Sequence, residues 1–148
     1  MKNLSVLLLT MISLSSINCK SQTLNNSIKM EKEIKNVIET FVKAGEERNV
    51  SMYNDILHED FRVIANRYPT PDKISIISSE DYIALITKKV IGGSKYGIVY
   101  ESIDIAEHSA TVRIELKAKK GGQIVTFLLI QNNENKWLII ADMAIQKK

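Results

Sequence analysis

The sequence has very little of the residues that build disulfide or metal sites. Cys19 is the single cysteine among 148 residues, which excludes an internal disulfide framework and any site made of several thiolates. The two histidines, His58 and His108, lie too far apart in the chain to form a local pair of ligands. The pairs Gly92-Gly93 and Gly121-Gly122 lack the further residues of a phosphate-binding loop. We therefore predict neither a metal site nor a cofactor.

An excess of charge of one sign is also lacking. The 20 Lys and Arg residues against 17 Asp and Glu give a net charge of +3, and the basic residues are spread along the chain. Such a weak and scattered positive charge excludes a nucleic-acid partner. The length and a hydrophobic content of 45% indicate one globular domain.

Long apolar runs are absent except at the N-terminus. Lys2 followed by the apolar stretch Leu4 to Leu14 predicts a signal peptide over residues 1–19, too short to span a membrane. Cys19 ends this stretch in a context that resembles the lipobox of a bacterial lipoprotein, which makes it the expected lipidation site; cleavage near Ser21 is the alternative. Residues 20–29 are polar and predict a flexible tether. The protein is expected to be exported to the bacterial cell envelope, attached to the membrane only by its lipid, or otherwise periplasmic or secreted.

Three helices are expected at the start of the domain over residues 30–148. The first carries an apolar stripe from Ile34 to Val42, and a second, short one follows over Met52 to Leu57. Ser78 and Asp81 resemble a capping box that starts a third helix, whose stripe runs to Val90 before Gly92-Gly93.

Strands make up the rest of the domain. A short strand is expected at residues 61–66 and a brief edge strand at residues 74–77. Four longer antiparallel strands follow Gly97, and the clearest of them, residues 110–119, alternates apolar and polar side chains. Residues 136–146 are apolar on both faces, which predicts a central strand or a face used for dimerisation. Helices that precede strands in this way indicate an α+β fold, with helices on one face of a curved sheet.

Several short segments of this pattern resemble the nuclear transport factor 2-like superfamily. They are the helix at residues 31–44, then residues 49–53, 57–61, 79–82, 110–112 and 135–139. Within the superfamily the chain is most similar to the lumazine-binding branch and next to the polyketide-cyclase-like branch. The resemblance implies a cone-shaped, cystatin-like roll in which three helices lie in a bent antiparallel sheet around a pocket. It does not by itself imply a shared function.

Two groups of side chains are candidates for chemistry in such a pocket. His58 and Asp60 precede the first strand, where the resemblance to enzymes such as ketosteroid isomerase implies a general base; the alternative is that they are an ordinary helix end and turn. Tyr53, Tyr82 and Tyr100 carry hydroxyls that can donate to a carbonyl or an enolate, or else are core aromatics.

Two acidic residues interrupt apolar patterns. Alternation places Glu101 on the face of Ile103 and Ile105, which indicates a buried carboxylate or, as we expect, a β-bulge at residues 100–102. Alternation also groups Asp142 with Leu138 and Ile140. Asp142 contacts a ligand if that face lines the pocket, and it is an ordinary acid if the face meets solvent beyond a dimer edge.

The sequence thus predicts a cofactor-free domain that binds a small apolar or aromatic molecule and forms a homodimer through its sheet. The alternatives are a cofactor-free isomerase, dehydratase or cyclase, and a protein-interaction domain.

Overall fold

The computed structural model describes residues 15–67, 71–119 and 121–146. Its elements are α1 (Ser15–Glu47), η1 (Val50–Tyr53), β1 (Leu57–Asn66), β2 (Ile74–Ser78), α2 (Ser79–Thr87), β3 (Gly97–Ala106), β4 (Ser109–Lys117), β5 (Gly122–Gln131) and β6 (Trp137–Gln146). The apolar stretch of the predicted signal peptide lies outside the described residues. In the part of the chain that is described, no helix has the length and apolarity needed to cross a membrane.

The chain divides into a unit of residues 1–33 and a unit of residues 34–148. In the first unit, α1 already includes residues 20–29, which we predicted as a tether. The sequence has no proline and no glycine between Ser15 and Ala44, so a polar segment can continue the helix there. Side chains 25–29 are exposed, and Lys29 Nζ lies 3.8 Å from a Glu33 carboxylate oxygen.

The expectation of three α-helices is wrong, because the described chain holds two. The segment predicted as the second helix is a 3-10 turn, η1, which ends at Tyr53. Leu57, which we placed in that helix, begins β1 and pairs with Ile139 of β6. Arg48 leaves the helical region with φ +52, and η1 takes four of the residues before Leu57, so no α-helix forms between α1 and this strand.

The start of α2 is as predicted and its end is not. The Ser78 hydroxyl accepts a hydrogen bond from the Asp81 backbone N–H at 3.1 Å, which confirms the cap. The helix ends at Thr87, and Lys89 adopts φ +59, outside the helical region. The predicted stripe position Val90 is therefore outside the helix, with 64% of its surface exposed.

The six strands form one curved sheet in the order β2-β1-β6-β5-β4-β3. The predicted edge strand is confirmed as β2, and the strand predicted to be central, β6, lies between β1 and β5. The four long strands β3 to β6 pair antiparallel, as expected. However, β1 and β6 pair parallel, so the sheet is mixed and the prediction of a fully antiparallel sheet is wrong. A parallel pair needs a long connection, and here α2 and four strands intervene.

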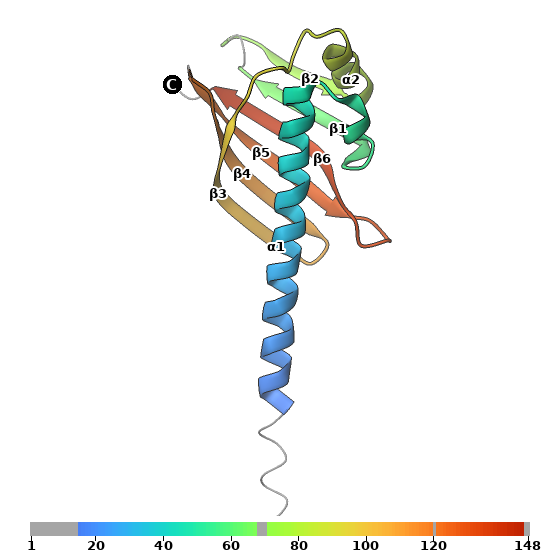
Figure 1. The fold of residues 1–148 in the computed structure, drawn as a ribbon, viewed down its shortest axis with the longest axis vertical. Helices are drawn as coiled ribbons and strands as arrows, with labels where there is room; N and C mark the ends of the chain where they lie inside the picture. The colour runs from blue at the N-terminus through green and yellow to red at the C-terminus, as the bar shows by residue number, and fades with distance from the viewer. Residues whose placement is uncertain (1–14, 68–70, 120, 147–148) are drawn as a thin grey trace, which may run out of the picture. The chain divides into compact units, whose positions relative to one another are not determined.

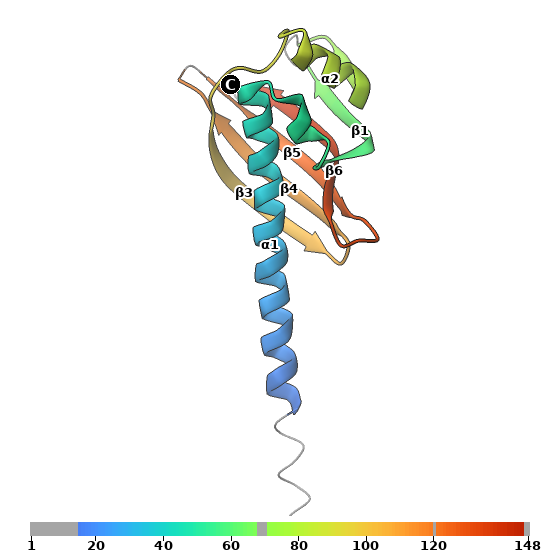
Figure 2. The ribbon, with the colours of Figure 1, turned by 45° about the vertical axis from the view of Figure 1, so that its right-hand side comes forward.

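The core lies on one face of this sheet, which we call the inner face. From Ile34 onward α1 lies across it, as two views show (Figures 1 and 2). Fully buried side chains on this face include Val112, Ile114 and Phe127, and α1 contributes Ile34 and Ile38. The side chains of the opposite, outer face alternate with these along each strand.

Candidate functional site

Five aromatic rings from five different elements meet above the inner face. Phe41 of α1 is at their centre, with ring centroids 5.4 Å from Tyr53, 6.0 Å from Tyr82 and 5.2 Å from Phe127. Phe61 of β1 completes the group at 6.1 Å from Phe41. We call these five residues the aromatic box. Offset and edge-on rings at such separations pack favourably, so the box ties both helices and η1 to the sheet.

A carboxyl group borders the aromatic box. Asp142 of β6 exposes 6% of its surface and pairs across the sheet with Phe127 on one side and Val63 on the other. Its Oδ1 atom has no hydrogen-bond partner. Burial raises the pKa of Asp142 from 3.8 to about 7. Near neutral pH the group can therefore exist as a hydrogen-bond donor or as a base.

A β-bulge brings Asp142 to the inner face. Leu128 pairs with Ala141 and Leu129 with Ile139, which leaves Ile140 without a partner position. The extra residue reverses the alternation, so Asp142 shares its face with Ile139 and Trp137. Grouping Asp142 with Leu138 and Ile140, as simple alternation did, is therefore wrong.

Two tyrosines of the aromatic box carry hydroxyl groups that face each other. The oxygens of Tyr53 and Tyr82 lie 3.3 Å apart and share one hydrogen bond. Burial raises the pKa of Tyr53 to about 12 and that of Tyr82 well above 10, and the charge on Asp142 raises both further. Both phenols are thus neutral donors at physiological pH. One shared bond uses one of their two protons, which leaves one hydroxyl proton available.

The charge on Asp142 contributes to the raised pKa of both tyrosine hydroxyls, so the three groups lie in the same region above the inner face. The box is apolar, one tyrosine hydroxyl proton is free to donate, and Asp142 supplies a second donor when it is protonated. Such a combination of many aromatic contacts and few converging polar groups is typical of a small-molecule site.

The histidine and aspartate predicted as a base lie in β1 rather than before it. Asp60 exposes 70% of its side chain and lies 3.9 Å from Arg62 Nη2. Its backbone N–H donates to His58 Nδ1 at 3.1 Å, which is a local contact within the strand. Neither side chain is among the buried polar groups.

The other two predicted candidates face different surroundings. Tyr100 of β3 donates to the Lys35 backbone oxygen at 3.2 Å, and burial and the neighbouring Glu39 carboxylate raise its pKa. Glu101 is the extra residue of a bulge between Tyr100 and Ser102, which confirms the bulge we expected. Its carboxylate accepts from Arg113 Nε at 2.7 Å at the exposed outer side.

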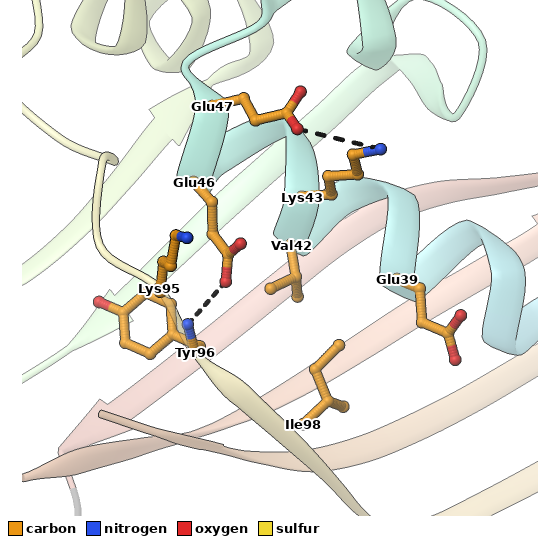
Figure 3. A pocket seen from close by; sticks show the side chains of 8 residues that line it. All are labelled: Glu39, Val42, Lys43, Glu46, Glu47, Lys95, Tyr96 and Ile98. Atoms are coloured by element: carbon orange, nitrogen blue, oxygen red, sulfur yellow. Dashed lines mark hydrogen bonds and ion pairs between the residues drawn. The ribbon is translucent and has the colours of Figure 1, made fainter. Parts of the chain in front are cut away.

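A separate pocket of about 360 Å³ lies between the end of α1 and the start of β3 (Figure 3). Its lining is mixed, with Val42 and Ile98 among charged side chains. Three of those charges are already engaged, since Glu46 accepts from the Tyr96 backbone N–H at 2.6 Å and Lys43 pairs with Glu47 at 3.9 Å. None of the residues predicted to contact a ligand lines this pocket.

Sequence reasoning missed the phenylalanines of the box and a further buried polar atom of β6. The phenylalanines of the box carry no signal beyond apolar periodicity, because their convergence depends on three separate elements. The buried indole N–H of Trp137, which also lacks a hydrogen-bond partner, was not singled out either. Among the described residues, no group of three or more His, Cys, Asp or Glu side chains is placed to hold a metal.

Comparison with known proteins identifies a matching family and structures of similar fold. A family model described as "Putative lumazine-binding" matches residues 29–143. No curated protein matches the chain. A nuclear transport factor 2-like protein of unknown function from Shewanella baltica aligns with TM-score 0.69 at 14% identity, over 82% of this chain and 96% of that one. A similar protein from Silicibacter pomeroyi aligns with TM-score 0.70 at 12% identity, over 82% and 98%.

A third structure carries the name of an activity. It is described as a "putative ketosteroid isomerase" from Parabacteroides distasonis and aligns with TM-score 0.59 at 14% identity, over 76% of this chain and 86% of that one. At such low sequence identities, the similarity to these structures shows a shared fold and does not show a shared activity.

Proposed function

Because the chain belongs to the lumazine-binding family matched above, within the nuclear transport factor 2-like superfamily, we propose that it binds a small, largely apolar or aromatic molecule. The site is the aromatic box together with Asp142 and the hydroxyls of Tyr53 and Tyr82. One observation carries the proposal: Oδ1 of a buried carboxyl group has no partner beside a cluster of aromatic rings.

The physical argument concerns that unpaired oxygen. Leaving a buried polar atom without a partner costs about 1–3 kcal/mol, and such atoms often mark a bound water or a ligand contact. A ligand that hydrogen-bonds Asp142 removes this cost, while its rings pack against the box. Ligand binding to the folded state then raises thermal stability.

A thermal-shift screen tests the proposal, with lumazine and other small heteroaromatic and carbonyl compounds as probes. We expect at least one compound to raise the melting temperature of the wild type. Asp142→Leu removes the polar group and should abolish the shift, whereas Asp104→Asn changes an exposed acid of β3 and should leave it intact. If no compound raises the melting temperature of the wild type, the result argues against ligand binding. If a compound shifts the melting temperature of both variants equally, the ligand binds at a site that does not include Asp142.

A second candidate function is a cofactor-free isomerase, dehydratase or cyclase. The observation that favours it is the buried, unpaired carboxyl group of Asp142, whose pKa burial raises to about 7, in the region of two phenols of raised pKa. Ionised Asp142 could remove a proton from carbon next to a carbonyl, while a tyrosine hydroxyl donates to the oxygen that becomes negative; returning the proton to another carbon completes an isomerisation.

Proton exchange distinguishes this enzyme from a binding protein. When ketone probes are incubated with the protein in D₂O, the carbon beside the carbonyl group should exchange hydrogen for deuterium. NMR measures this exchange. Asp142→Asn should abolish the exchange, and Asp60→Asn, in an exposed residue, should not. If Asp60→Asn abolishes it instead, the base is the one we first inferred from the sequence.

We also propose a homodimer through the outer face of the sheet. Five apolar side chains on that face are among the exposed large hydrophobic residues of the described chain: Ile74, Ile76, Val99, Leu128 and Met143. Such a face suits a second copy, and a heterologous protein partner is the alternative. Sedimentation should give a dimer that Leu128→Lys dissociates and Lys88→Glu, at the exposed C-cap of α2, does not.

Export and lipid attachment at Cys19 complete the proposal, and they rest on the apolar stretch before it and the lipobox resemblance. Expression in a bacterial host with labelled palmitate should label the wild type and not Cys19→Ser. Label-free protein released into the periplasm or medium would support plain secretion instead.

A further inference from the structure

Two buried side-chain atoms have no hydrogen-bond partner among the described residues, and both belong to β6. They are Nε1 of Trp137 and Oδ1 of Asp142. Trp137 exposes 2% of its surface and Asp142 exposes 6%. Buried polar groups are nearly always paired, so two exceptions on one strand need a common explanation.

The bulge at Ile140 places these two side chains on the same face. Trp137 pairs with Gln131 of β5, and Asp142 pairs with Phe127. These partners are four residues apart, and a strand rises about 3.3 Å per residue, so the two positions are separated by roughly 13 Å. Without the bulge, Trp137 and Asp142 would point to opposite faces of the sheet.

The strand between the two positions is apolar. Ile139 and its partner Leu129 expose 0% and 1%. The indole N–H of Trp137 can only donate a hydrogen bond, and a protonated carboxyl group can also donate one. We call the inner face between Trp137 and Asp142 the strip. A hydrogen-bond acceptor would satisfy the polar atom at each of its ends, whereas its middle offers only apolar contacts.

We propose, as an extension of the ligand-binding function above, that the inner face of β6 recognises an elongated neutral molecule with a hydrogen-bond acceptor at each end. One acceptor binds the indole N–H of Trp137, and the other binds Asp142. The carbon skeleton between them lies on Ile139 and Leu129. A molecule with a single acceptor leaves one of the two polar atoms unpaired.

Binding along this strip requires movement. Since Ile139 and Leu129 are fully covered, a ligand reaches them only when elements packed on the inner face move away from it. Association should therefore be slower than diffusion allows.

Linear diketones provide a direct test. The probes are diketones of 6 to 14 carbons with the carbonyl groups next to the terminal methyl groups, each compared with the monoketone of the same carbon number. Trp137 is the only tryptophan of the chain, so its fluorescence reports occupation of one end in the wild type. Calorimetry measures affinity in the variants.

We expect one diketone length to bind about fivefold more tightly than its monoketone, the effect of one additional hydrogen bond. Trp137→Phe and Asp142→Leu should each remove this preference. Asp142→Asn keeps a donor at the position and should retain the preference, and Thr126→Val, on the outer face of β5, serves as the control.

Equal affinity for diketone and monoketone at every length would overturn two-point recognition. If both ketones bind equally and their binding still depends on Asp142, the proposed ligand-binding function is supported and only two-point recognition is wrong. Failure of all ketones to bind overturns the two-point inference as well, and the thermal-shift panel then decides separately whether the domain binds any small molecule.

Discussion

The hydroxyl oxygens of Tyr53 and Tyr82 lie 3.3 Å apart, although the residues belong to η1 and α2. Their rings also meet edge to face, with centroids 5.6 Å apart. The contact joins the two short helical elements above the inner face and places phenolic protons in the same electrostatic environment as Asp142. Both the stability of the domain and its proposed chemistry depend on this region.

The tyrosine pair should behave as a coupled unit. Tyr53→Phe leaves the Tyr82 hydroxyl without its partner and should cost about 1 kcal/mol, and Tyr82→Phe should cost a similar amount. The double variant should cost less than the sum of the two, because neither unpaired hydroxyl remains. Urea denaturation of the four proteins measures the coupling, and strictly additive losses would show that the hydroxyls do not interact.

The stability of the domain should depend on the titration of Asp142. Its pKa is raised on folding, so the folded state binds more protons than the unfolded state between the two pKa values, 3.8 and about 7. The contribution is complete below pH 3.8 and is lost as pH rises through about 7. Each pKa unit corresponds to about 1.4 kcal/mol, so the loss is at most roughly 4 kcal/mol.

Asp142→Asn isolates this effect, because it removes the titration and leaves the other groups in place. Denaturation midpoints at pH 5 and pH 8 should show a larger loss for the wild type than for the variant. Parallel pH profiles of the two proteins would mean that Asp142 is ionised throughout and is solvated in solution.

The loop after α2 should not tolerate a side chain at Gly92. This residue has φ +78, and a Cβ atom there would lie 2.5 Å from the Gly45 backbone oxygen at the end of α1. Gly121→Ala is a matched control, since Gly121 has φ +74 and nothing within 4 Å of the added atom. Both variants should lose about 1–2 kcal/mol from the left-handed backbone, and Gly92→Ala should lose clearly more in thermal denaturation. Equal losses would indicate that the loop shifts freely.

The cap of α2 provides a test of local stability. Ser78→Ala removes the acceptor of the Asp81 N–H and should cost about 1 kcal/mol. Ser78→Asp supplies another acceptor and should restore most of that loss. Amide exchange of the first turn of α2 measures the effect, and unchanged exchange in the alanine variant would contradict a role for the cap.

Local patterns in the sequence determined much of the fold. Alternation predicted the strand at residues 110–119, the Ser78 cap marked the start of α2, and the misplaced charge of Glu101 revealed its bulge. These features depend on neighbouring residues and on the rule that an unpaired charge is not buried. The resemblance to the nuclear transport factor 2-like superfamily rested on the same local segments.

Only the tertiary structure decided the site. The parallel pairing of β1 with β6 joins strands far apart in the sequence, and the five rings of the aromatic box come from five elements. The bulge at Ile140 is set by the register of β6 against β5, which no period-two pattern contains. That one extra residue turns Asp142 inward, so the most informative side chain of the protein was determined by how two strands align.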